Sequence, residues 1–281
     1  MKRAIKRALG HGMAMSHLDA VLLRQTGVVV AFHRVNDRPA SNGLSVSRST
    51  FERYCRYFKD HFRVVPLREI VYRLEHGRPL DRELAITFDD GYRDNFDNAA
   101  PVLDTLSLPA TFFVVTRWIG SDVVPWWDAA DGGVHPWMTW PQVRLLHERG
   151  FDIGAHTRTH VDLGSAGPSE VEDEVPGARR DLEDRLGARV DLFAYPYGGR
   201  HNLHDGSRQA VKAAGFRCCC SCYGGVLTEW ADPFKLPRVP VTPRYASPHE
   251  FMFDLALRRS ITEPDPAGSL VTSRGTSCCA T

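Results

Sequence analysis

Short apolar runs alternate along the chain with longer stretches in which apolar residues recur at helical spacing. The apolar runs are nearly continuous, as is typical of strands buried on both faces of a parallel sheet. They cover residues 27–32, 84–88, 111–116, 151–155, 190–195 and 216–221. The amphipathic stretches predict helices over residues 51–61, 67–76, 95–106, 141–149, 169–186, 205–214 and 248–258.

This alternation predicts an α/β fold with a parallel sheet and right-handed crossovers. At 281 residues, a closed or nearly closed (β/α) barrel is favoured over an open sheet. In either architecture, catalytic residues collect where the strands end. We expect one catalytic domain over residues 27–260 and a disordered tail over residues 261–281, which are rich in Pro, Gly, Ser and Thr.

The first 26 residues form a separate segment that opens with four basic residues, interleaved with apolar ones. Their spacing predicts a short amphipathic helix rather than a secretory signal, because polar residues interrupt the apolar run. Two interpretations are open. The helix packs on the domain, or its basic face docks on an anionic membrane surface. We expect a protein that is cytoplasmic or peripheral to the inner face of a membrane.

The charge balance excludes one class of partner. The chain has 35 basic and 34 acidic residues, whereas nucleic-acid-binding proteins usually carry a basic excess. A neutral acetylated glycan is compatible with this balance, and the sequence indicates no oligomeric state. Four of the seven cysteines fall within residues 218–222, where neighbours on a strand would point to opposite faces. We interpret them as buried thiols rather than a metal site.

Titratable residues follow several of the expected strands directly. Asp89 and Asp90 come after residues 84–88, and His156 and His160 come after residues 151–155. Two histidines four residues apart can reach one ion, and a carboxylate from a neighbouring strand completes a three-ligand set with open positions. In a pair of adjacent carboxylates, one can bind the metal while the other takes a proton from water.

Three motifs in this order resemble those of a known family. They are TFDDG at residues 87–91, HTRTH at residues 156–160 and FAYPYG at residues 193–198. They resemble the first three motifs of the polysaccharide deacetylases, also called NodB-homology domains or family 4 carbohydrate esterases. The resemblance covers most of residues 27–240. It implies a distorted (β/α)7 barrel that removes acetyl groups from N-acetylglucosamine units with a divalent metal, zinc first, with cobalt, nickel or manganese as alternatives.

The resemblance also implies roles for individual residues. By position, Asp89 would be the general base, and Asp90 would bind the metal with His156 and His160. The backbone amide of Tyr197 would contribute to the oxyanion hole.

The chain departs from the family pattern at the third motif. An arginine usually opens that motif and pairs with the catalytic base, but Ala194 stands there. Arg238, Arg34 and Arg93 are the candidates to replace it, and the sequence does not choose among them.

A second departure concerns the general acid, which in the family is a late histidine at a strand end. No such strand and histidine follow residue 240, whereas His33 directly follows the first expected strand. In a closed barrel the last strand can move to the front of the chain without moving the site. The deacetylases of poly-N-acetylglucosamine exopolysaccharide have such permuted motifs, so we expect His33 to be the general acid.

Substrate contacts are expected from aromatic residues, because sugar rings stack on them. Trp126, Trp127 and Trp140 lie in a loop-rich stretch and are candidates, with core packing as the alternative. Arg238 is a further candidate for binding substrate.

The sequence thus predicts a metal-dependent hydrolase of N-acetyl groups on a polysaccharide or oligosaccharide. Two alternatives stay open. One is a hydrolase of another linear or cyclic amide on the same scaffold, and the other is a non-catalytic glycan-binding relative.

Overall fold

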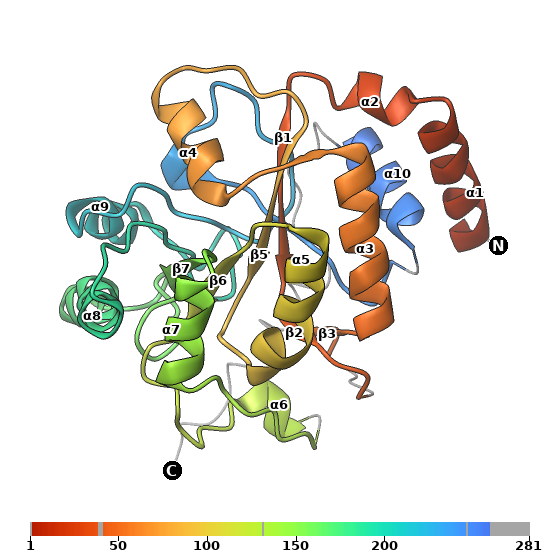
Figure 1. Ribbon diagram of the computed structural model, residues 1–281. Coiled ribbons are helices and arrows are strands. Elements are labelled where there is room, and N and C mark those ends of the chain that lie inside the picture. Colours follow the sequence, from red (N-terminus) through yellow and green to blue (C-terminus); the bar gives the residue numbers. More distant parts are fainter. Residues whose placement is uncertain (1, 39–41, 131, 246, 259–281) are drawn as a thin grey trace, which may run out of the picture.

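The computed structural model describes residues 2–38, 42–130, 132–245 and 247–258 (Figure 1). Its strands are β1 (Gly27–Phe32), β2 (Arg34–Val35), β3 (Ser45–Val46), β4 (Arg63–Val64), β5 (Glu83–Phe88), β6 (Thr111–Val114), β7 (Asp152–Ala155) and β8 (Val239–Pro240). Its α-helices are α1 (Lys2–Met15), α2 (Leu18–Leu22), α3 (Arg48–His61), α4 (Leu67–Glu75), α5 (Ala100–Leu106), α6 (Trp126–Ala130), α7 (Trp140–Glu148), α8 (Pro168–Leu186), α9 (Asp205–Ala213) and α10 (Pro248–Arg258). A π-helix, Asn95–Ala99, precedes α5, and a 3-10 turn, Pro233–Lys235, precedes β8.

The main sheet closes into a barrel. Its strands pair in the order β7-β6-β5-β1-β8, and all these pairs are parallel. Beyond β7, parallel bridges join Ala155 to Phe193, Ala194 to Cys220, and Cys220 to Leu236, just before β8. Seven segments therefore form a ring, which confirms the expected (β/α)7 barrel.

The apolar pattern located the long strands well and the short ones poorly. Residues 27–32 were predicted with their observed bounds, and β5, β6 and β7 differ from prediction by at most two residues at either end. Residues 190–195 and 216–221 contribute only isolated bridges, two in each segment, so the expectation of full strands there was wrong. The strands β2, β3, β4 and β8 have two residues each, which is too short to show a period.

Alternation along β1 divides its side chains between two apolar clusters. Val28, Val30 and Phe32 pack with residues of α3, α5 and α8, whereas Val29 packs in a second cluster with residues of α4. Every residue of β1 and β5 is buried. This two-sided burial is the reason that their sequences read as continuous apolar runs.

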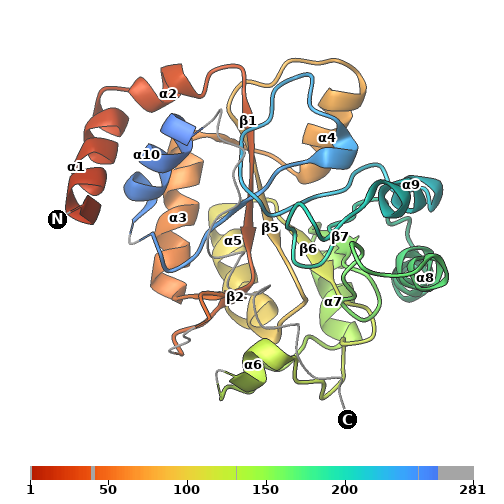
Figure 2. The same cartoon turned by 180° about the vertical axis from the view of Figure 1, so that it is seen from behind.

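The N-terminal segment forms the expected helix, α1, which packs against α10 on one flank of the barrel (Figures 1 and 2). Lys6 Nζ lies 2.7 Å from Asp254 Oδ1 and ties the two helices together. None of the described helices is both long and apolar enough to cross a membrane. The tail predicted over residues 261–281 lies outside the described residues.

Candidate active site

The strand register brings the predicted site residues to one mouth of the barrel. Phe32 of β1 pairs with Phe88 of β5, so the residues that follow them, His33 and Asp89, leave neighbouring strands side by side. A cavity of about 70 Å³ opens there. Its walls include His33, Asp89, Asp90, Trp127, His156, His160 and Tyr197.

Asp90, His156 and His160 form a group that could hold a metal ion. All three are buried, and their ligand atoms lie within 4.8 Å of one another. His156 Nε2 is 3.4 Å and His160 Nε2 is 3.3 Å from Asp90 Oδ1. Asp90 Oδ1 is buried without a hydrogen-bond donor, which is costly unless a cation satisfies it. Two imidazoles and one carboxylate match the donor set of catalytic divalent metals.

The tautomer of His156 is fixed by the backbone of Ala194. His156 Nδ1 lies 2.7 Å from the Ala194 carbonyl oxygen, which can only accept, so Nδ1 carries the hydrogen. The Nε2 lone pair is then directed toward Asp90. Such a backbone contact is the usual means of orienting a metal-binding histidine.

The site is built on strained backbone. Of the eight described non-glycine residues with positive φ, four belong to the site: Asp90, Thr157, His160 and Tyr197. Each such conformation costs on the order of 1–3 kcal/mol and persists only where the surroundings enforce it. Thr157 contributes to this enforcement, because its Oγ1 accepts a hydrogen bond from the backbone N–H of His160 at 3.0 Å.

The carboxylate of Asp89 is held by Arg238 rather than by an arginine of the third motif. Two nitrogens of the guanidinium donate to the two carboxylate oxygens at 2.6 and 2.7 Å. Burial acts to raise the pKa of Asp89, but the charges of Arg238 and His156 outweigh it and hold the pKa below its usual value. Asp89 is therefore ionised at neutral pH and able to accept a proton.

This contact corrects one prediction. Arg238 is fully buried, and it also donates to the Ser221 carbonyl at 2.6 Å and to Thr87 Oγ1 at 3.0 Å. Its donors are engaged inside the barrel, so Arg238 does not have the accessible position expected of a substrate-binding residue.

The other two arginine candidates lie elsewhere. Arg93 forms an exposed pair with Asp97, at 3.0 Å. Arg34 forms a fully buried pair with Asp128 of α6, at 2.6 Å. This second pair is connected to Trp127, in the wall of the cavity, through one further residue.

That residue is Tyr92, which connects the Arg34–Asp128 pair to the cavity wall. Its hydroxyl donates to Asp128 at 2.9 Å and accepts from Trp127 Nε1 at 2.9 Å. Trp127 is thereby held against His160, with 5.0 Å between ring centroids. The helix α6 was not predicted from the sequence, because five residues are too few to show a helical period.

The three predicted tryptophans are separated by the fold. Trp127 lines the cavity, and Trp126 is 49% exposed and packs edge-on against it. Trp140 begins α7, where the guanidinium of Arg185 lies 5.2 Å from its ring centroid. It is not among the residues that line the cavity, and its contact with substrate stays a prediction.

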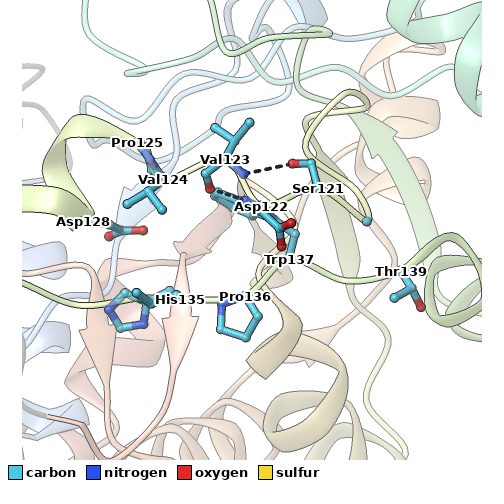
Figure 3. A pocket seen from close by; sticks show the side chains of 12 residues that line it. Ser121, Asp122, Val123, Val124, Pro125, Asp128, His135, Pro136, Trp137 and Thr139 are labelled. Carbon is cyan, nitrogen blue, oxygen red and sulfur yellow. Dashed lines mark hydrogen bonds between the residues drawn. The ribbon is translucent and has the colours of Figure 1, made fainter.

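A larger hollow of about 250 Å³ also borders α6, through Asp128 (Figure 3). Asp128, His135 and Trp137 contribute to its lining, together with the loop at residues 120–125. It contains none of the three grouped metal ligands. We therefore place the chemistry in the smaller cavity.

Comparisons with known proteins agree with this geometry. Residues 76–219 match the model of the family described as polysaccharide deacetylase. The poly-beta-1,6-N-acetyl-D-glucosamine N-deacetylase of Staphylococcus epidermidis is 24% identical over 244 residues, covering 78% of this chain and 80% of that protein.

Solved structures show the same fold. The Streptococcus pyogenes deacetylase PplD, in complex with acetate, superposes with a TM-score of 0.70 at 20% identity. IcaB from Ammonifex degensii superposes with a TM-score of 0.68 at 22% identity. Each comparison covers 82% of this chain and 97% of the other.

The metal group generates a prediction about binding. The purified protein should bind one divalent ion, and His160→Ala should weaken zinc binding by more than about 100-fold, since losing even an outer-shell partner costs 10–100-fold. Isothermal titration with zinc measures this directly. His201→Ala is the control, because His201 is exposed and lies outside the group. Equal affinities for the two variants would contradict the assignment.

Proposed function

The chain belongs to the polysaccharide deacetylase family, and we propose that it hydrolyses N-acetyl groups on N-acetylglucosamine units of a polysaccharide or oligosaccharide. The products would be acetate and a free amine. The observation that carries this proposal is the juxtaposition of the Asp90, His156 and His160 group with an ionised carboxylate held by a buried arginine. A metal site and a fixed base are the two requirements for activating water against an amide.

We propose that Asp90, His156 and His160 hold a divalent ion. When bound, the ion supplies Lewis acidity to the amide carbonyl and lowers the pKa of water at the site. Two imidazoles and a carboxylate suit zinc, and cobalt, nickel and manganese are compatible with the same donors.

The remaining groups have roles that follow from their positions. Asp89 takes the proton of the attacking water while Arg238 keeps its carboxylate in place. The backbone N–H of Tyr197, in the turn that lines the cavity, donates to the developing oxyanion. His33 protonates the departing nitrogen. Burial lowers the pKa of His33, with partial compensation from Asp90 and Asp89, so its protonated form is a strong proton donor.

The substrate is proposed to be a glycan related to poly-N-acetylglucosamine. The name of the Staphylococcus epidermidis relative supports this choice. Trp126, exposed beside the cavity wall, offers a ring on which a sugar can stack. We place the enzyme in the cytoplasm or at the inner face of a membrane, where it would act on a precursor glycan.

A substrate panel tests the function. Acetate release is measured from β-1,6-linked and β-1,4-linked N-acetylglucosamine oligomers and from a cyclic ureide, each with and without chelator. Release from the oligomers that chelator abolishes is expected. Turnover of the ureide alone would favour the other amide hydrolase, and binding of oligomers without turnover would favour a glycan-binding protein.

If Asp89 is the general base, replacing it should reduce turnover without preventing metal binding. Asp89→Asn removes the proton acceptor and leaves the three metal ligands in place, so kcat should fall by about 10²–10⁴-fold with zinc still bound. Steady-state acetate release and metal analysis on one preparation measure both properties. Asp97→Asn is the control, because Asp97 forms an exposed pair with Arg93. Full activity of Asp89→Asn would refute its role as base.

If His33 is the general acid, the loss of activity on replacing it should depend on whether the leaving group needs a proton. His33→Ala should lose about 10²–10⁴-fold in kcat on the N-acetylated sugar, because the amine must be protonated as it leaves. Hydrolysis of 4-nitrophenyl acetate should be much less affected, since a nitrophenolate leaves without a proton. Equal losses on both substrates, or no loss on either, would contradict the role of His33.

A further inference from the structure

The helix α1 is fixed on the barrel by its small residues. Gly10 faces α10 so closely that an added Cβ would lie 2.0 Å from the His249 carbonyl oxygen. Ala14, one turn later, is also buried. Together with the Lys6–Asp254 ion pair, this close crossing sets the rotation of α1 about its axis.

With that rotation, five large apolar side chains of the N-terminal segment are exposed. Five of the twelve exposed large hydrophobic residues of the described chain lie there: Ile5 (51% exposed), Leu9 (51%), Met15 (72%), Leu18 (44%) and Val21 (66%). A surface helix of a soluble protein normally places such residues against the core. We call these five residues the outer face of α1 and α2.

Within the segment itself, the exposed charges beside the outer face are positive. Among the described side chains of residues 4–24, Arg7 and Arg24 are exposed. Asp19, the single acidic residue of that stretch, is 2% exposed. Exposed Asp81 lies at the far end of the segment, where its Oδ1 accepts from the Gln25 N–H at 3.4 Å. Apolar side chains that share a segment with exposed cations, and with no exposed carboxylate within residues 4–24, complement the interface of a membrane that contains anionic lipids.

We propose that the outer face of α1 and α2 docks the protein on an anionic membrane surface, with its apolar side chains in the headgroup region. This goes beyond the proposed function, because none of these residues belongs to the site. It also differs from the sequence-based expectation, in which the basic face of the helix made the contact.

A second copy of the chain fits the outer face less well than an anionic membrane does. A symmetric dimer buries the same patch on both subunits, so exposed Arg7 and Arg24 of one copy would face a segment that carries the same two cations. A lipid surface meets the same cations with phosphate groups instead.

The position of the outer face is compatible with catalysis. The segment leads into the start of β1, whereas the mouth of the barrel lies at its other end, near β2 and α6 (Figures 1 and 2). A membrane held along this flank leaves the mouth open to a glycan that extends from or lies near the bilayer.

Co-sedimentation of the full chain with vesicles tests the proposal. Wild type should bind vesicles of phosphatidylcholine with 30–40% phosphatidylglycerol, and the double variant Ile5→Glu, Leu9→Glu should bind at least about tenfold more weakly, since acidic residues oppose insertion beside anionic lipid. The control is Leu145→Glu, an exposed apolar residue of α7 on another part of the surface (43% exposed).

Each outcome is decisive for the docking surface. Equal binding by the double variant and wild type, or no binding by wild type, would overturn the proposal. Equal binding to pure phosphatidylcholine would overturn its electrostatic part. A concentration-dependent dimer in sedimentation velocity that the double variant abolishes would replace the membrane by a second copy. Acetate release from soluble oligomers should be unchanged in the double variant, which separates this test from that of the proposed function.

Discussion

Arg238 and Asp89 meet inside the barrel, with exposed side-chain fractions of 0% and 4%. Burying two charges costs several kcal/mol per ion, and such a pair persists only when its geometry and additional hydrogen bonds compensate. Here the pairing is bidentate, and further donors of Arg238 reach Thr87 and Ser221. Arg238 precedes β8, the strand that completes the ring beside β1. The segment that closes the barrel therefore also carries the arginine that orients the carboxylate of Asp89 at the mouth.

The second buried ion pair extends this arrangement to the cavity wall. Arg34 follows His33 directly and reaches Asp128 of α6, and Tyr92 joins the pair to Trp127. Three segments that carry site residues are thus tied to one another by polar contacts in the interior. Through Trp127 they also reach His160, one of the site residues with positive φ, and strained backbone persists only under such external constraint.

Much of the site was readable from the sequence because its residues directly follow long apolar strands. Asp89, Asp90, His156 and His160 are of this kind, and the register of β1 with β5 then places His33 beside them. The partner of Asp89 could not be predicted from the sequence, because the choice among three arginines depends on how the ring of strands closes. That closure uses single bridges and a two-residue strand, which leave no periodic signal. The outward face of α1 was hidden for a similar reason, since it is set by the contact between Gly10 and α10.

We propose that Arg238 holds Asp89 in the orientation that catalysis requires, in place of the arginine missing at Ala194. The most direct test is kcat for Arg238→Lys, measured on protein shown to be folded and loaded with metal. A lysine keeps the charge but cannot form the two-point contact. We expect kcat to fall by about 10²-fold, the order expected for a misplaced catalytic group, with KM little changed. A folded, metal-loaded Arg238→Lys variant with the turnover of wild type would contradict it.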